Sequence, residues 1–451
     1  MGENVIREEY ANSRIWLPEE VYDLFKGKLI TEMVENLCIP KAYYFFEDDF
    51  VNYSNIFKRM QSLKILIVGY RTFSSNCAIT YLPSSLRFID WPGFPSFSLP
   101  KSFEPSQLVV LCLRKSCLAE LWPISKKLSN LKHLDLSKSL ELTKTPNFGD
   151  MPILEKLKLE GCVNLIEVHP SLGHCRMLTY LSLRECVKLK KLPKFVCMDS
   201  LETLNLLECT RLEEFTEICG DMCGLSRLYV GSPWIRSLPP SLSGLRDLQL
   251  TGCEVLETLP NSLFESQQLE HLEIDRCSGL VKLPISIGVQ KKLRRLEIDR
   301  CENLKNLPSS IQMESLEYLK ISNSPKLDTF PEIKGDMHYL KNLNLNSTGI
   351  REVPSSIGNL SGLTELNLDG CEDLVSLPDS LCNLMNLWHL SLRGCKKLEK
   401  LPENMGDLRK LLIFDASDTA IYQPPPSITK LGKLKCLYLS GPPNFVSIYF
   451  L

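Results

Sequence analysis

Leucine positions dominate the hydrophobic pattern of the chain. The motif L-x-x-L-x-L-x-x-(C/S/T)-x-x-L-x-x-L-P starts fourteen times between Leu131 and Leu434, at intervals of 20 to 24 residues. In its first half, as in LEKLKLEGC, Leu157 and Leu159 alternate with the polar Lys158, which is the period of a strand with one buried and one exposed face. In its second half, as in LPDSLCNLMNL, a proline comes before leucines spaced three apart, which predicts a short helical or 3-10 turn.

A single unit of this kind cannot bury its own leucines, so neighbouring units must stack and share one core. Fixed-period repeats with these leucine spacings are the signature of leucine-rich repeats. The predicted fold class is therefore α/β, a leucine-rich-repeat solenoid of horseshoe form. Its parallel sheet is expected on the concave face and its short helical or 3-10 turns on the convex face. Degenerate copies at Leu63, Leu86 and Leu108 bring the total to about seventeen repeats, the last of them incomplete.

Cysteine recurs at one position of the repeat, just after the strand, and three roles compete for it. The first two are a ladder of disulfides and a row of metal ligands, and the third is a small buried residue that forms hydrogen bonds. The same position holds Ser139, Ser324, Thr348 and Thr419 in other repeats, and neither serine nor threonine forms a disulfide. We therefore expect buried thiols that satisfy loop backbone groups. The cysteines concerned are Cys162, Cys186, Cys209, Cys253, Cys277, Cys301, Cys371 and Cys395.

Composition and charge narrow the range of partners and compartments. The formal net charge is −2, so no electrostatic drive toward nucleic acid or an anionic membrane is expected. No apolar run reaches the roughly 18 residues that a membrane span needs, and the N-terminus MGENVIREEYANSR lacks the apolar core of a signal peptide. The eighteen cysteines then suggest reduced thiols. We expect a cytoplasmic protein, with the nucleus as the alternative compartment.

No catalytic constellation can be defended from residue spacing. The six histidines are scattered over the repeats, and no serine–histidine–acid or cysteine–histidine arrangement follows from their positions. His169, His174 and Cys175 share one turn segment, a weak candidate for a metal site. We predict that the protein is not an enzyme and holds no cofactor and no metal.

The exposed strand positions are the remaining candidates for function. The sequence LEIDRC occurs in two consecutive repeats, Leu272–Cys277 and Leu296–Cys301, and stacking should bring each charged residue beside its counterpart. The expected neighbours are Glu273 and Glu297, Asp275 and Asp299, Arg276 and Arg300, and His271 and Arg295. With Arg294 they form a charged mosaic on the concave face that could pair with a protein partner. The alternative is a set of solvated charges left by repeat duplication.

Aromatic residues extend this set, because tyrosine, tryptophan and arginine dominate the energetics of protein interfaces. The candidates, expected at matching strand positions, are Tyr180, Tyr229, Tyr318, Trp388 and Tyr438. Beside Cys371, the exposed Asn367 and Asp369 also vary between repeats and are added as candidates.

Before Leu63 the repeat is not legible, and the sequence RIWLPEEVYDLF predicts a helix from Pro18 to about Phe25 with a short apolar strand after it. The stretch VIREEYANSRIWLPEEVYDLF resembles the end of the winged-helix part of the nucleotide-binding domain in plant intracellular disease-resistance proteins of the toll/interleukin-receptor class. The segment Leu82–Trp122 is similar to the first repeats of that family. The matching residues are Leu82, Pro83, Leu86, Arg87, Trp91, Phe94, Pro95, Leu99, Pro100, Phe103, Pro105, Leu121 and Trp122.

This resemblance implies a domain organisation. Residues 1–55 would be the remnant of the winged-helix end of a nucleotide-binding domain, acting as an N-terminal cap, and residues 56–451 the leucine-rich-repeat domain. The chain contains no G-x-x-x-x-G-K-[S/T] loop to cradle phosphate. We therefore expect the N-terminal and nucleotide-binding domains of the class to be lacking, and nucleotide hydrolysis is not carried over.

The resemblance also implies a function. The chain would be the protein-recognition module of a plant innate-immune receptor that senses pathogen effectors or a guarded host protein. In the family the repeats also restrain the nucleotide switch, so the nucleotide-binding domain of a full-length receptor would be a second partner. The alternative is a free-standing intracellular leucine-rich-repeat scaffold for signalling complexes.

Overall fold

The computed structural model describes residues 13–40, 53–70, 79–122, 124–215, 222 and 224–439. The chain divides into two compact units, Met1–Leu225 and Ser226–Leu451, which are treated separately below. Among the described residues, no helix has both the length and the apolar character of a membrane span.

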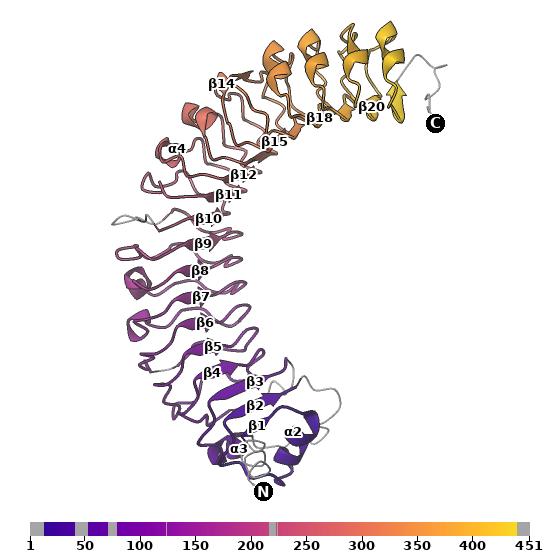
Figure 1. The fold of residues 1–451 in the computed structure, drawn as a ribbon. Coiled ribbons are helices and arrows are strands. Elements are labelled where there is room, and N and C mark those ends of the chain that lie inside the picture. Colours follow the sequence, from indigo (N-terminus) through magenta and orange to yellow (C-terminus); the bar gives the residue numbers. More distant parts are fainter. Residues whose placement is uncertain are drawn as a thin grey trace. The chain divides into compact units, whose positions relative to one another are not determined.

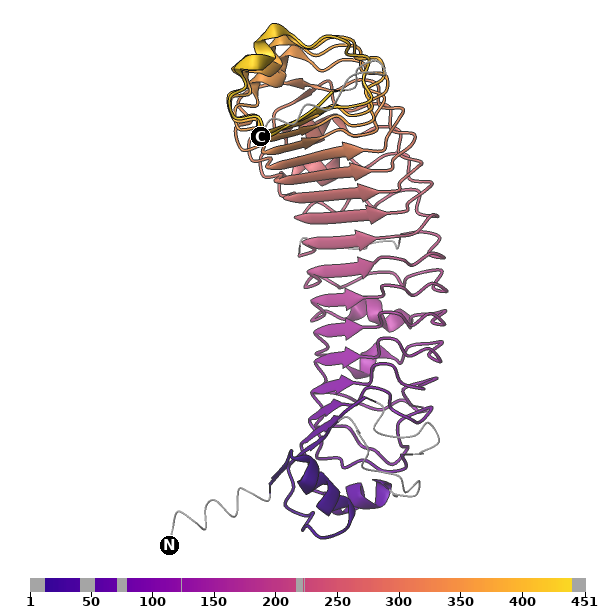
Figure 2. The ribbon, with the colours of Figure 1, turned by 90° about the vertical axis from the view of Figure 1, so that its right-hand side faces the viewer.

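The first unit is built on short parallel strands that pair in chain order (Figures 1 and 2). Each strand contributes a buried residue that alternates with outward-facing residues, as the sequence pattern predicted. Turns on the opposite side carry short 3-10 helices. The elements are β1 (Arg14–Ile15), α2 (Pro18–Phe25), β2 (Asn36–Ile39), α3 (Tyr53–Arg59), β3 (Ile65–Val68), β4 (Phe88–Asp90), β5 (Val110–Cys112), β6 (His133–Asp135), η1 (Phe148–Asp150), β7 (Lys156–Lys158), η2 (Pro170–His174), β8 (Tyr180–Ser182) and β9 (Thr203–Leu206).

The second unit repeats this plan, and the side lined by its strands is called the strand side from here on. Its strands are β10 (Arg227–Val230), β11 (Asp247–Thr251), β12 (His271–Asp275), β13 (Arg295–Asp299), β15 (Tyr318–Ser322), β17 (Asn342–Asn344), β18 (Glu365–Asn367), β19 (His389–Ser391), β20 (Ile413–Ala416) and β21 (Cys436–Leu439). The turn side carries α4 (Ser262–Glu265), η3 (Ile285–Val289), η4 (Ser355–Asn359), η5 (Asp379–Asn383), η6 (Met405–Asp407) and η7 (Pro426–Lys430). The predicted leucine-rich-repeat fold is confirmed.

Two repeats replace the predicted 3-10 turn with extended chain. The short strands β14 (Ser310–Ile311) and β16 (Glu332–Ile333) pair in parallel on the turn side. In the first of them Ile311 and Met313 are buried while Gln312 is exposed. This alternation has the period of a strand rather than of a helix, and the helical turn fails to form for that reason.

The core consists of leucine and isoleucine rows that run across the strands. Leu272 pairs in register with Leu296, which pairs with Leu319, and all three side chains are buried. Burial of one such side chain contributes about 1.5–3 kcal/mol. Because each strand shares its apolar row with the next, the stacking expected from the sequence is also the main source of stability.

The N-terminal segment continues the sheet instead of standing apart from it. Strands β1 and β2 lie within residues 1–55, and β2 pairs in parallel with β3. The predicted helix at Pro18–Phe25 is confirmed. Its start is held by Glu20, whose carboxylate accepts hydrogen bonds from the backbone N–H groups of Trp16 and Leu17, both at 3.0 Å. The strand pairing therefore begins before residue 56. Residues 1–12 and 41–52 of the expected cap lie outside the described residues.

The recurrent cysteines form a buried hydrogen-bonded ladder. The Sγ atoms of Cys162, Cys186 and Cys395 each lie 3.2 Å from a carbonyl oxygen in the preceding repeat, those of Leu136, Leu159 and Leu368. Among the described residues every cysteine is a free thiol. Burial raises the pKa of the Cys395 thiol to about 12, so the group stays protonated and donates. The predicted architectural role of this position is confirmed.

A left-handed residue precedes each member of this ladder. Lys138, Arg276 and Arg300 have φ values of 60°, 52° and 52°, a region that non-glycine residues rarely adopt. The backbone N–H of Arg276 donates to the carbonyl of Asp299 at 2.9 Å, and that of Arg300 donates to the carbonyl of Ser322 at 3.1 Å. Because these bonds join successive repeats, they fix where each of the two arginine side chains leaves the backbone.

Candidate protein-binding surface

The charged mosaic lies on strands β12, β13 and β15 of the second unit. The register pairs His271 with Arg295, Glu273 with Glu297 and Asp275 with Asp299. These neighbours are the ones that the repeated sequence LEIDRC predicted. The next strand interrupts the duplication, because Tyr318, Lys320 and Ser322 follow in the same three rows.

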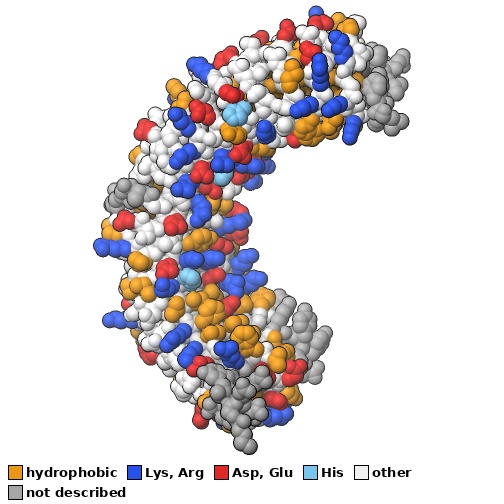
Figure 3. Space-filling model, in the orientation of Figure 1, with side chains coloured by type: hydrophobic (Ala, Val, Ile, Leu, Met, Phe, Trp, Pro, Cys, Tyr) orange, Lys and Arg blue, Asp and Glu red, His pale blue; other side chains and the backbone are white. Residues whose placement is uncertain are grey.

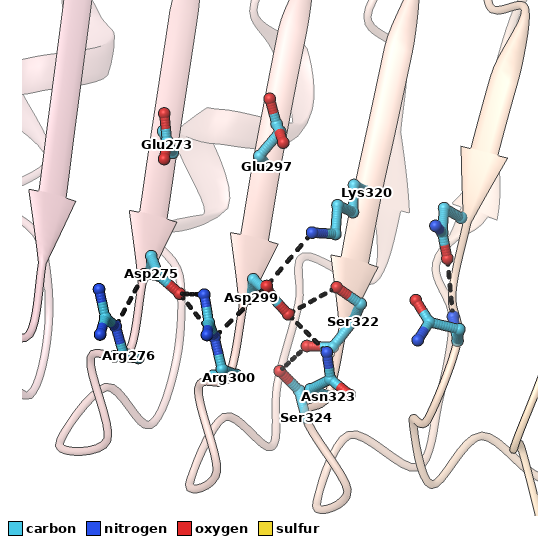
Figure 4. A network of polar contacts seen from close by, with 12 residues as sticks. Glu273, Asp275, Arg276, Glu297, Asp299, Arg300, Lys320, Ser322, Asn323 and Ser324 are labelled. Atoms are coloured by element: carbon cyan, nitrogen blue, oxygen red, sulfur yellow. Dashed lines mark hydrogen bonds and ion pairs between the residues drawn. The ribbon is translucent and has the colours of Figure 1, made fainter.

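Asp275 is the anchor of the mosaic (Figure 4). Its Oδ2 accepts from Nε of Arg276 at 2.9 Å. Its Oδ1 accepts from Nη2 of Arg300 at 2.8 Å and from Nε of the same guanidinium at 2.9 Å. One carboxylate thus holds two guanidinium groups from successive repeats, and both of its oxygens are occupied.

Asp299 stands in the same row and is held differently. Its Oδ1 accepts from Ser322 Oγ and Asn323 Nδ2, both at 2.8 Å, and its Oδ2 lies 3.2 Å from Lys320 Nζ. Partial burial works to raise the pKa of Asp299, but these three hydrogen bonds outweigh it and keep the pKa below its usual value. Lys320, Ser322 and Asn323 were missed by the sequence reasoning. Their only signal was their place one repeat beyond the duplicated motif.

Arg295 forms a second arm of the mosaic. Its guanidinium carbon lies 4.3 Å from the centre of the Tyr318 ring, within the range of a cation–π contact. Its Nε donates to Glu297 in the same strand. This hydrogen bond raises the pKa of Arg295. Tyr318 therefore packs against a charged neighbour on the adjacent strand instead of offering a separate aromatic contact.

Glu273 accepts one side-chain hydrogen bond from a neighbouring strand. Gln249 Nε2 donates to its Oε1 at 3.3 Å. Partial burial, together with the carboxylates of Glu297 and Asp275, raises the pKa of Glu273. Arg294 at the mosaic's edge is paired with Glu317 at 3.1 Å, while His271 is exposed beside Arg295.

The five aromatic candidates do not share one strand position, so that part of the sequence interpretation is wrong. Tyr318 lies in the row of His271, whereas Tyr229 and Tyr438 lie in rows that pair with Gln249 and Asp415. Trp388 comes just before β19 and stacks on His389 at 5.5 Å. Counted from the leucines of each repeat, Tyr180 and Tyr318 precede the second leucine, whereas Tyr229 and Tyr438 follow it, so their side chains occupy different rows of the sheet.

Most of these aromatic side chains already have a polar neighbour. The hydroxyl of Tyr180 lies 3.4 Å from Glu160, and Lys158 sits over its ring at 5.6 Å. The hydroxyl of Tyr229 donates to Asp247 at 3.0 Å. Trp388 lies outside the mosaic strands, whereas Tyr318 is in contact with the mosaic residue Arg295.

Asn367 and Asp369 also proved to be architectural. Asn367 Oδ1 accepts from the backbone N–H of Asp369 at 2.8 Å, an Asx turn that ends strand β18. Asp369 Oδ1 accepts from the backbone N–H of Arg393 in the next repeat at 3.0 Å. Their variation between repeats reflects alternative turn chemistry, and neither residue remains a strong candidate for recognition.

The arrangement supplies oriented charged groups that a binding partner could contact. In the space-filling view, acidic and basic side chains are interspersed over the surface (Figure 3). Over the described part of the chain, no three His, Cys, Asp or Glu side chains are placed to hold a metal ion. What the mosaic offers is a set of oriented guanidinium and carboxylate groups on a rigid sheet.

Repeats of this length, stacked through parallel strands with a buried hydrogen-bonding ladder, define a leucine-rich-repeat protein. A family model described as "Disease resistance protein RPS4B-like, leucine-rich repeats" matches residues 312–398. TMV resistance protein N of Nicotiana glutinosa is 33% identical over 446 residues, which is 98% of this chain and 28% of that protein. Disease resistance protein RPS6 of Arabidopsis thaliana is 34% identical over 318 residues, 65% of this chain and 26% of its own length.

The resemblance to the leucine-rich-repeat region of plant disease-resistance proteins is thereby confirmed. The chain spans little more than a quarter of the length of TMV resistance protein N. Among solved structures, a leucine-rich-repeat protein of Leptospira interrogans aligns with a TM-score of 0.41 at 17% identity, covering 93% of this chain and 92% of that one.

Proposed function

We propose that this chain is the protein-recognition module of a plant innate-immune receptor and senses pathogen effectors or a guarded host protein. The observation that carries the proposal is the similarity to TMV resistance protein N over 98% of the chain. The mosaic supports it, since arginine and aromatic side chains on a rigid surface are the usual anchors of protein interfaces. The proposal includes a cytoplasmic or nuclear site of action and no catalysis.

Binding to defined proteins tests recognition. The purified chain is presented to a panel of individually purified pathogen effectors and host cytosolic proteins, with affinity measured by titration calorimetry. We expect saturable binding of a panel member that is weakened by substitutions on the strand side and unchanged by Ile166→Asp, an exposed position after the strand of a first-unit repeat. Saturable binding that survives every strand-side substitution would place recognition elsewhere.

The second part of the proposal concerns restraint of a nucleotide switch. Around helix α2 the large side chains Trp16, Leu17, Ile30 and Met33 are all more than half exposed. Clustered apolar exposure of this kind marks interaction sites. We assign this surface to contact with the nucleotide-binding domain of a receptor of this class.

Co-purification tests that contact. The chain is expressed with the separately produced nucleotide-binding part of TMV resistance protein N, and Trp16→Asp with Met33→Asp is compared with Ile166→Asp. We expect the double variant to lose the complex and the control to keep it. Equal recovery of all three complexes would refute the assignment. Absence of ATPase and NAD-cleaving activity in the purified chain checks the non-catalytic part.

A further inference from the structure

By count, the mosaic on β12, β13 and β15 is close to charge-balanced, but its two signs lie at different depths. The side chains of Asp275 and Asp299 are 12% and 16% exposed. Those of Arg276 and Arg300 are 60% and 51% exposed. Arg276 and Arg300 lie just past the ends of β12 and β13, beside Asp275 (Figure 4). Because the guanidinium groups are far more exposed than the aspartates, they are the groups that a partner can reach.

The buried acids have little capacity left for a partner. Asp275 accepts from Arg276 and Arg300, and Asp299 accepts from Ser322, Asn323 and Lys320. A carboxylate carries two oxygens, and in both residues each oxygen is already engaged. Asp275 orients Arg276 and Arg300, and Asp299 Oδ2 also lies 3.5 Å from Nε of Arg300. Both aspartates are therefore positioning residues for the arginines.

The arginines, in contrast, retain donors. A guanidinium has five N–H groups, and Asp275 engages Nε of Arg276, and Nε and Nη2 of Arg300. Both side chains are more than half exposed, so their remaining N–H groups are open to a partner. Arg295 adds a third exposed guanidinium, held by Glu297 and stacked on Tyr318 at 4.3 Å.

These guanidinium groups are also ordered before any partner arrives. The left-handed backbone at Arg276 and Arg300 is tied to the next repeat by hydrogen bonds of 2.9 and 3.1 Å, and one carboxylate orients both side chains. Freezing a long, flexible side chain on binding costs conformational entropy. Because part of that cost is already met in the free protein, a partner gains more from each contact.

From this geometry we infer that the strand side of β12, β13 and β15 binds an acidic protein segment, whose Asp or Glu carboxylates pair with Arg276, Arg300 and Arg295. Guanidinium groups held in fixed planes match carboxylates bidentately. The inference rests on the proposed function of protein recognition and specifies the chemistry of the partner. Glu273 and Glu297 between the arms would exclude segments with carboxylates along their whole length.

The test uses a matched pair of double variants. The first is Arg276→Gln with Arg300→Gln, and its control is Lys115→Gln with Lys138→Gln. Lys115 and Lys138 occupy the same left-handed repeat position in the first unit, with φ values of 56° and 60°. Both double variants remove two positive charges from equivalent backbone sites. The probe is a synthetic peptide of alternating glutamate and serine, and its counterpart carries glutamine in place of glutamate.

Fluorescence anisotropy of the labelled peptides measures binding to the full chain. We expect the glutamate peptide to bind in a salt-dependent way, the glutamine peptide to bind at least about tenfold more weakly, and the arginine double variant to lose about tenfold in affinity. The lysine double variant should bind like the wild type. A third double variant, Arg276→Lys with Arg300→Lys, keeps both positive charges and should bind the glutamate peptide with intermediate affinity. Its midpoint of unfolding in urea shows whether the fold is retained.

Several results would overturn the inference. These are no binding of the glutamate peptide, equal binding of the two peptides, equal losses in the arginine and lysine double variants, or wild-type affinity in Arg276→Lys with Arg300→Lys. Each of them leaves the protein panel and the co-purification test of the proposed function unaffected, because those measurements do not depend on the acidity of the partner.

Discussion

The carboxylate of Asp275 binds the guanidinium of Arg300 from the next repeat at 2.8 Å, and it holds Arg276 of its own repeat at 2.9 Å. Neither contact could be assigned from the sequence LEIDRC, because each copy contains two acids and one base and several pairings are possible. The pairing across repeats determines which charge is buried and which one a partner can reach.

Replacing Asp275 with asparagine should destabilise the second unit. The side chain is largely buried and binds two cations, and charge-assisted hydrogen bonds each contribute about 1.5–3 kcal/mol. Because the arginines can partly rehydrate, we expect a net loss of about 1–3 kcal/mol in the free energy of unfolding, measured in urea. Asp328→Asn, at an exposed position of the same unit, should change it by less than about 0.5 kcal/mol. Similar effects of the two substitutions would contradict the anchoring role.

The buried cysteine position should tolerate only a small side chain that can donate a hydrogen bond. Cys186 is buried and its Sγ lies 3.2 Å from the carbonyl of Leu159. Serine keeps a small donor at this place, as Ser139 does in its own repeat, where Oγ lies 3.4 Å from the carbonyl of Leu113. We expect Cys186→Ser to change the free energy of unfolding by less than about 1 kcal/mol, and Cys186→Leu to lower it by about 1–3 kcal/mol through overpacking. A larger loss for serine than for leucine would refute this role.

Alanine substitutions at two glycines distinguish the cost of backbone strain from the cost of a steric clash. Gly252 has φ +64° with nothing within 4 Å of an added Cβ, whereas the Cβ of an alanine at Gly362 would meet the carbonyl oxygen of His338 at 1.7 Å. Gly252→Ala should therefore lower the free energy of unfolding by about 1 kcal/mol, from conformation alone. Gly362→Ala should cost clearly more, because the contacted atom belongs to the backbone and cannot rotate away. Urea titration of both variants ranks them, and the reverse order would disprove the explanation.

The contributions of Glu273 and Asp299 to folding stability should change with pH in opposite directions. The pKa of Glu273 is raised, so its ionised form disfavours the folded state at neutral pH, and that penalty disappears as pH falls through the raised pKa. The pKa of Asp299 is lowered, so it stabilises the fold above the ordinary aspartate pKa, and this contribution is lost as pH falls through the lowered one.

Thermal unfolding of variants over a pH series measures this difference. At neutral pH we expect Glu273→Gln to raise the melting temperature slightly. The corresponding gain in the free energy of unfolding should be less than about 0.5 kcal/mol, because much of the side chain is exposed to solvent. Asp299→Asn should lower the melting temperature. Both differences should shrink in strongly acidic solution, where the wild-type carboxyls are protonated. A constant difference across the series would show that titration of these groups is not responsible.

The regular part of the structure was predictable because the leucine period is a direct physical signal. Alternating leucines at Leu157 and Leu159 define a strand with one buried face, and β7 forms there. The register of Glu273 with Glu297 followed from the repeat length, since two strands at the same place in equal repeats must stack in phase. The replacement of cysteine by serine or threonine in other repeats likewise indicated that the position just after the strand has a structural role.

By itself, then, the sequence determined the repeat, the outward side of each strand and the neighbours within the duplicated motif. Only the tertiary structure decided which charges are anchors and which are accessible, and that Tyr318 packs against Arg295. The physical reason is that side chains on a parallel sheet also take hydrogen-bonding partners from the next repeat, more than twenty residues away in the chain. Lys320 and Asn323 reach Asp299 across such a separation, and no local pattern of hydrophobic and polar residues encodes that contact.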